Sequence, residues 1–197
     1  EKTLQQEKSS SAVVFYWGVK KSFPELTLHN IFFSDDYQAE YEGIFKTRKV
    51  VNDPTIYINI TSKYVDGDAP EGCENWFTMI NVPNNQGQDW DCLIEEARKN
   101  ILAKIHRILG VDVEPLIEVE DLLDTRTIES RTSSAQGALY GNSSNNRFAA
   151  FLRHANFSSD IKNLFFCGGS VHPGGGIPLS LLSAKIMTEF VGKGGME

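Results

Sequence analysis

The chain has 197 residues, of which 41% are apolar and 23% charged, as in ordinary globular proteins, and its formal net charge is −7. This acidic balance argues against a nucleic-acid partner, which would need a stripe of basic residues, and no apolar run reaches the roughly 18–20 residues of a membrane span. Three scattered cysteines and four histidines without ligand spacing predict neither a disulfide framework nor a metal site.

Strands are predicted where β-branched and aromatic residues cluster or alternate with polar ones. The predicted strands are residues 11–19, 29–33, 55–61, 75–82 and, as an edge strand after Pro115, 116–120. Strands 55–61 and 75–82 are expected to pair. Within the former, alternation places Ile56, Ile58 and Ile60 in the core and leaves the Tyr57 face more exposed or turned toward a substrate cavity.

Helices are predicted in three places in the same part of the chain. Ser34 is expected to cap a helix through Phe45, with two aspartates in its first turn and Tyr37 and Tyr41 on its apolar face. Apolar residues recur every three or four positions over 89–109, and Gly110 follows as a stop. A third, short helix is expected near 122–131.

Residues 1–135 are therefore expected to form an α+β domain, a mixed β-sheet with helices on one face. It shows no nucleophile–base pair, and its acidic patches indicate solvated faces. Trp76, Phe77 and Met79 are expected to pack in the core rather than to line a pocket. The first ten residues lack the apolar centre of a signal peptide and do not begin with Met, so we expect a fragment or a processed product.

Residues 163–186, NLFFCGGSVHPGGGIPLSLLSAKI, have a different character. Residues 164–167 predict a buried strand, Gly168 and Gly169 a turn, and 177–190 a buried helix. A strand, a glycine turn and a helix N-terminus together present backbone N–H groups and a positive dipole end, as anion sites do. The alternative is that the glycines serve only tight turns and close packing, and the residues alone leave it open.

The segment FFCGGSVHPGGGIP resembles the C-terminal signature of the phytoene desaturase family, the bacterial carotenoid desaturases among FAD-dependent oxidoreductases. The family form is close to GAGTHPGAGIPG, and GALYG (137–141) and AAFLRH (149–154) resemble the segment that precedes it. The matching positions are Gly168, His172, Pro173, Gly174, Gly176, Ile177 and Pro178.

This resemblance implies that residues 1–135 are a substrate-binding domain and that 136–197 are the returning strand–helix segment of a Rossmann-like FAD domain. The implied FAD-binding residues are Gly168, Gly169, Ser170, Gly175, Gly176, Ile177 and Pro178. The helix N-terminus would abut the flavin ring, where its dipole favours the reduced flavin's negative charge. No catalytic residue is identified. His172 is expected to fix the turn rather than to act as acid or base, while Arg153 anchors either the chain or a cofactor oxygen.

The sequence departs from the family pattern at Ser170 and at Leu179–Ser180, and it lacks the G-x-G-x-x-G fingerprint. We therefore expect the C-terminal part of a desaturase that introduces double bonds into a long carotenoid with FAD as hydride acceptor, inactive alone. The intact enzyme is expected in the cytoplasm with peripheral membrane contact. The alternatives are a related FAD-dependent carotenoid or retinoid enzyme (a hydroxycarotenoid desaturase, an isomerase or a saturase) or a non-catalytic binding module.

Overall fold

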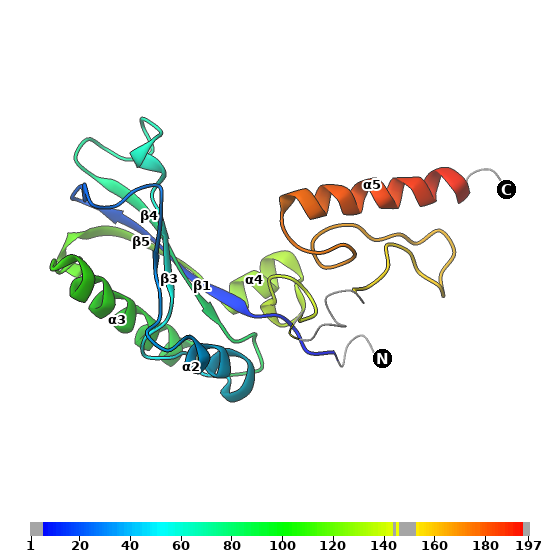
Figure 1. The fold of residues 1–197 in the computed structure, drawn as a ribbon, viewed down its shortest axis with the longest axis horizontal. Coiled ribbons are helices and arrows are strands. Elements are labelled where there is room, and N and C mark those ends of the chain that lie inside the picture. Colours follow the sequence, from blue (N-terminus) through cyan, green and yellow to red (C-terminus); the bar gives the residue numbers. More distant parts are fainter. Residues whose placement is uncertain (1–5, 144, 146–152, 195–197) are drawn as a thin grey trace. The chain divides into compact units, whose positions relative to one another are not determined.

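The computed structural model describes residues 6–143, 145 and 153–194, and contacts within the chain define two units (Figure 1). We call Ser10–Gly137 the sheet unit. The glycine-turn unit combines Glu1–Ser9 with Ala138–Glu197, so an N-terminal and a C-terminal segment contribute to the same unit.

The sheet unit contains one five-stranded sheet in the order β2-β3-β4-β1-β5. Its strands are β1 (Ser11–Val19), β2 (His29–Phe32), β3 (Ile56–Asn59), β4 (Glu74–Val82) and β5 (Ile117–Leu123). Every pair in this sheet is antiparallel, so the expectation of a mixed sheet was wrong. Side-chain alternation specifies the two faces of a strand but not its direction, which depends on the connections. The predicted pairing of β3 with β4 and the edge position of β5 are confirmed.

One face of the sheet and helix α3 (Trp90–Leu109) enclose the core. Ile56, Ile58 and Ile60 are 0% exposed, whereas the Tyr57 side is only half-buried, which confirms the predicted register. The Asp89 side chain accepts a hydrogen bond from the Cys92 N–H and caps α3. The helix ends at Gly110, whose φ of 67° is the left-handed conformation that favours glycine.

Three aromatic or sulfur-containing side chains of β4 were expected in this core, and the strand divides them between its faces. Trp76 is in the core, while Phe77 and Met79 lie half-buried on the opposite face. Alternation explains the split, because Trp76 is one residue away from Phe77 and three from Met79.

The second predicted helix is shorter than expected and starts later. Helix α2 spans Tyr37–Glu42, and a π-helical segment, η1 (Gly43–Thr47), continues it. The cap is Asp36, whose carboxylate accepts from the Ala39 N–H at 2.9 Å, rather than Ser34. The Ser34 hydroxyl instead accepts a hydrogen bond from the Asp36 N–H.

The remaining elements of the sheet unit are short. Helix α4 (Thr125–Thr132) follows its cap Asp124 directly after β5, because the two leucines expected in that helix still belong to the strand. Short 3₁₀ segments are η2 (Thr61–Lys63), η3 (Glu114–Leu116) and η4 (Ala135–Gly137).

The glycine-turn unit contains one long helix, α5 (Ile177–Gly194). Residues 164–167 form no strand, only an isolated bridge between Phe157 and Phe165, so that prediction was wrong. The burial predicted for α5 is wrong as well, since Ile177 is 79% and Leu181 67% exposed. The physical reason is the same in both cases: the described residues of this unit supply neither a neighbouring strand nor a second apolar layer.

No helix within the described residues combines the length and the apolar composition that crossing a bilayer requires.

Candidate functional site

The glycine-rich turn, residues 168–176, is attached to α5 by two buried polar side chains, Asn156 and Ser183. The Asn156 amide nitrogen lies within hydrogen-bond distance of the Phe166 and His172 carbonyls, at 3.1 and 2.9 Å, and of the Ser183 hydroxyl at 2.9 Å. That hydroxyl also accepts from the Gly168 N–H at 3.1 Å. The polar groups thus fix the course of the turn before any ligand is considered.

Four of the five glycines of this turn fall into two groups. A Cβ on Gly175 would lie 2.3 Å from the Tyr140 ring, and one on Gly169 would lie 3.3 Å from the Gly175 backbone. These glycines permit close packing. Gly168 and Gly176 instead have φ of 118° and 97°, and a Cβ on either would meet no protein atom within 4 Å. Their backbone is therefore open to something other than the described protein.

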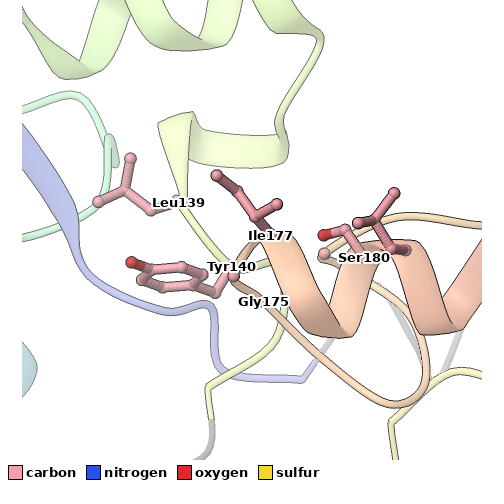
Figure 2. Close-up of a pocket in the computed structure, with 8 residues that line it drawn as sticks. Leu139, Tyr140, Gly175, Ile177 and Ser180 are labelled. Carbon is pink, nitrogen blue, oxygen red and sulfur yellow. The ribbon is translucent and has the colours of Figure 1, made fainter.

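A pocket of about 470 Å³ lies beside this turn, at the first residues of α5. In Figure 2, Tyr140 lies next to Gly175, and Ile177 and Ser180 project from the beginning of the helix. The pocket is lined by Leu139, Tyr140, Gly169, Gly175, Gly176, Ile177, Ser180 and Leu181. Pro178 has no N–H and the Ser180 N–H donates to the Gly176 carbonyl, so the Ile177 and Leu179 N–H groups are the ones of the first turn that can donate to a ligand. The positive dipole end also lies there, so this pocket suits a ligand with anionic or carbonyl oxygens.

A second hollow, of about 400 Å³, shares Tyr140 and the last two glycines with the first and adds Arg153. The Arg153 guanidinium donates to the Tyr140 carbonyl at 3.0 Å and to the Gly169 carbonyl at 3.4 Å. Of the two roles considered for Arg153, these contacts favour anchoring of the chain.

Tyr140 is itself positioned by the N-terminal residues. Its N–H donates to the Ser9 hydroxyl at 3.0 Å, and the neighbouring Ser9 N–H donates to the Gly141 carbonyl at 2.8 Å. Lys8 bridges to Asn142 and donates to its side-chain oxygen at 2.8 Å. Burial lowers the pKa of Lys8 from its ordinary value, because desolvation disfavours the ammonium form.

The structure brings together four of the seven predicted site residues, Gly169, Gly175, Gly176 and Ile177, in one pocket wall. Gly168 lies in the same turn. Ser170 is directed to Gly141, where an added Cβ would come 3.0 Å from the serine Cβ. Pro178 is the second residue of α5 and is exposed.

Sequence reasoning missed Leu139 and Tyr140 as pocket residues, although both lie in the GALYG segment that carried part of the resemblance. It also placed Ser180 outside the site. The signal available for Tyr140 was an aromatic residue between two glycines, but only the fold shows that its ring covers Gly175. His172 contributes backbone contacts: its N–H donates to the His154 carbonyl at 2.9 Å, and its side chain is exposed.

A second candidate surface lies on the sheet unit, on the face opposite α3. Tyr16, Phe77 and Tyr57, which we call the aromatic row, come from the neighbouring strands β1, β4 and β3. Their rings meet edge to face, with centroids 5.5 Å and 6.2 Å apart. At its end the Tyr57 hydroxyl lies 2.8 Å from His29 Nδ1. Such a row offers an apolar contact for an extended conjugated ligand.

Among the described residues, no three His, Cys, Asp or Glu side chains gather as metal ligands would.

Comparison with known proteins gives a consistent set of relatives. The chain is 62% identical, over 97% of its length, to a 1-hydroxycarotenoid 3,4-desaturase from Flavobacterium sp. (strain P99-3), and covers 39% of that protein. It is 33% identical over 95% of its length to a phytoene desaturase from Fusarium fujikuroi, covering 36%. It is 30% identical over 97% of its length to a 4,4'-diapolycopene oxygenase from Methylomonas sp, covering 39%.

No family model matches the chain. The chain spans about two-fifths of the length of the relatives that it matches. Two of these relatives are named desaturases and one an oxygenase, and each match extends over nearly all of this chain. Over that shared part, the similarity of the chain to these relatives supports a carotenoid desaturase family.

Proposed function

We propose that this chain is the C-terminal part of an FAD-dependent desaturase that acts on a 1-hydroxycarotenoid. The observation that carries the proposal is the 62% identity, over 97% of the chain, to the 1-hydroxycarotenoid 3,4-desaturase. The phytoene desaturase and the 4,4'-diapolycopene oxygenase are only 33% and 30% identical to the chain, which favours a 1-hydroxycarotenoid over the substrates of those two enzymes. Residues 1–135, apart from Glu1–Ser9, which group with the glycine-turn unit, would form the substrate domain, and 136–197 a returning segment of a Rossmann-like FAD domain.

The glycine-turn unit fits FAD by two features of its own residues. The open backbone at Gly168 and Gly176 admits a close ligand, and the pocket beside the α5 N-terminus offers N–H donors to flavin oxygens. Gly169, Gly175, Gly176 and Ile177 would hold the cofactor there, while Arg153, Asn156 and Ser183 hold the turn. FAD, when bound, accepts a hydride equivalent from the substrate.

The exposed apolar side chains of α5 support the same proposal. Leu179, Leu182, Phe190 and Val191 are exposed in addition to the two residues described above. A helix that is apolar around most of its circumference is normally enclosed on several sides. We assign the missing cover to the remainder of the FAD domain in the longer protein. The chain alone should accordingly retain little FAD and show no turnover.

On the sheet unit, the aromatic row would contact the carotenoid. Tyr16 and Tyr57 are partly exposed, and the α3 face opposite them is closed by core packing. Carotenoids partition into bilayers, so we propose peripheral membrane contact for the intact cytoplasmic enzyme.

The test is product analysis. The longer protein that contains this chain is produced in cells that accumulate a 1-hydroxycarotenoid, and pigments are resolved by chromatography and mass. A product lighter by two hydrogens, with FAD in the purified protein, supports the proposal. An oxygenated, isomerised or hydrogenated product assigns another carotenoid reaction, and unchanged pigment from a flavin-free protein supports a binding module.

A further inference from the structure

A third pocket, of about 380 Å³, lies between α2, η1 and the sheet face that carries the aromatic row, and we call it the α2 pocket. Its apolar walls are Ile31, Phe33, Tyr41, Phe45 and Tyr57. Tyr41 and Phe45 pack against each other one turn apart, with ring centroids 4.8 Å apart and planes inclined by 41°, and form the helical wall. All of its lining residues belong to the sheet unit, and none belongs to the glycine-rich turn.

One wall of this apolar pocket contains a carboxyl group. Glu40 is 2% exposed and lines the pocket. Its Oε1 accepts from the Thr55 N–H at 2.9 Å, and its Oε2 accepts from the Thr55 hydroxyl at 2.7 Å. Among the described residues Thr55 is the only partner of this carboxyl group. A carboxylate has about four acceptor positions, so two remain for a donor that enters the pocket.

The pocket continues the aromatic row. Tyr57 ends the row and also lines the pocket, so an extended molecule lying along Tyr16 and Phe77 reaches the pocket at Tyr57. The volume lies near the lower limit of the roughly 300–1,000 Å³ typical of small-molecule sites. It therefore suits one end of a long polyene rather than the whole molecule.

Resting on the function proposed above, we infer that the α2 pocket binds the hydroxyl-bearing end of the carotenoid, with Glu40 accepting the hydrogen bond of that hydroxyl. The apolar walls hold the branched hydrocarbon around it. A site that is built to pair a hydroxyl rejects an analogue without one, because the buried acceptor then loses its partner. Glu40 thereby becomes the residue that selects a hydroxylated over an unhydroxylated end.

The experiment uses the 197-residue chain, isotope-labelled for NMR, and two small probes. Tetrahydromyrcenol is a short branched alcohol that mimics such an end, and its methyl ether has nearly the same shape but donates no hydrogen bond. We expect the alcohol to bind at least tenfold more tightly, with the Thr55 amide among the resonances that shift most. Because no flavin or turnover is involved, failure of the proposed desaturase function would not affect this result.

Glu40→Gln is the diagnostic variant. The amide can keep both contacts with Thr55, its oxygen accepting from the N–H and its nitrogen donating to the hydroxyl, yet it replaces one acceptor atom by a donor. We expect the preference for the alcohol to fall to less than threefold. Glu42→Gln is the control: this glutamate lies on the same helix, pairs with Lys46 outside the pocket, and should leave the preference unchanged.

Thermal unfolding of both variants shows whether they remain folded. Equal affinity of the original chain for alcohol and ether would overturn the inference, as would shifts located away from the pocket or a full preference retained in a folded Glu40→Gln. If Glu40→Gln does not fold, Tyr41→Ala, which opens the helical wall, must lower the affinity for both probes, and unchanged affinity would overturn the location.

Discussion

The sheet unit encloses its large apolar side chains between the sheet and α3, whereas the glycine-turn unit leaves much of α5 uncovered and buries polar groups instead. In the former, Trp17, Trp76 and Phe15 are almost fully buried. In the latter, Asn156 and Ser183 are the buried connection between turn and helix. The difference indicates that the first unit has a core of its own, whereas buried polar contacts fix the turn of the second, whose uncovered helix we assign, as a proposal, to FAD and further protein.

The largest effect should come from the core of the sheet unit. Trp76 packs against Phe23, with ring centroids 5.2 Å apart, and donates to Glu74 at 2.8 Å. We expect Trp76→Ala to lower the free energy of unfolding by about 3–5 kcal/mol, through lost burial and an unpaired carboxyl oxygen. Urea denaturation measures this change in the free energy of unfolding. Tyr64→Ala, at a 70% exposed aromatic, should cost under about 0.5 kcal/mol, and equal losses would contradict the assignment of the core.

A smaller and local effect is expected in the glycine-turn unit. Asn156→Ala leaves the Phe166 and His172 carbonyls without their side-chain donor, a cost of about 1–3 kcal/mol. Hydrogen exchange should show faster opening of residues 166–172 while strands β1 and β4 keep their protection. Ser159→Ala, at an exposed hydroxyl, is the matched control. Uniform loss of protection across both units would mean that they unfold as one.

The smallest effect concerns acid stability of the sheet unit. Burial raises the pKa of Asp124, but hydrogen bonds from Thr127 and Arg126 outweigh it, and the net pKa is below its ordinary value. The stabilisation is therefore present above the unfolded pKa of about 4 and is lost as the pH falls through the folded pKa. Asp124→Asn keeps a helix cap, so we expect a loss below about 1 kcal/mol at pH 7 and a flatter stability curve under pH 4. Denaturation at several pH values measures both effects. If the stability curves of the original chain and of Asp124→Asn run parallel as the pH falls, the lowered pKa of Asp124 does not contribute to acid stability.

The sequence predicted the sheet unit well because its signals are local. Ile56, Ile58 and Ile60 alternate, and Gly110 ends a strongly periodic helix, so faces and boundaries follow from spacing. Strand direction did not follow, nor did the cap at Asp36, since Ser34, Asp35 and Asp36 are all competent caps and tertiary contacts select among them.

In the glycine-turn unit, the motif correctly located four residues that line the pocket. The physical reason for a glycine at these positions, however, is not always the expected contact with a cofactor. Gly175 is a glycine because Tyr140 covers it, a contact between segments far apart in the sequence. Residues 164–167 have strand composition, yet a strand needs a hydrogen-bonded neighbour, and among the described residues this segment has only the isolated bridge between Phe157 and Phe165. The composition of a segment does not reveal whether a neighbouring strand is available to pair with it.

The central claim is that the open backbone at Gly176 faces a flavin. The most direct test is the FAD content of the purified longer protein carrying Gly176→Val, compared with Gly67→Val. Both glycines have positive φ, 97° and 92°, and neither has a protein atom within 4 Å of an added Cβ, but Gly67 lies in the sheet unit. Backbone strain is thus matched, and only the position differs.

We predict that Gly176→Val loses its FAD and its desaturation, with a retention weaker by roughly a thousandfold, equivalent to ~4 kcal/mol. The cooperative unfolding of the sheet unit should persist, and Gly67→Val should retain FAD like the unmodified protein. Full FAD content and normal activity in Gly176→Val would contradict the account and show that these glycines serve turn geometry and packing alone.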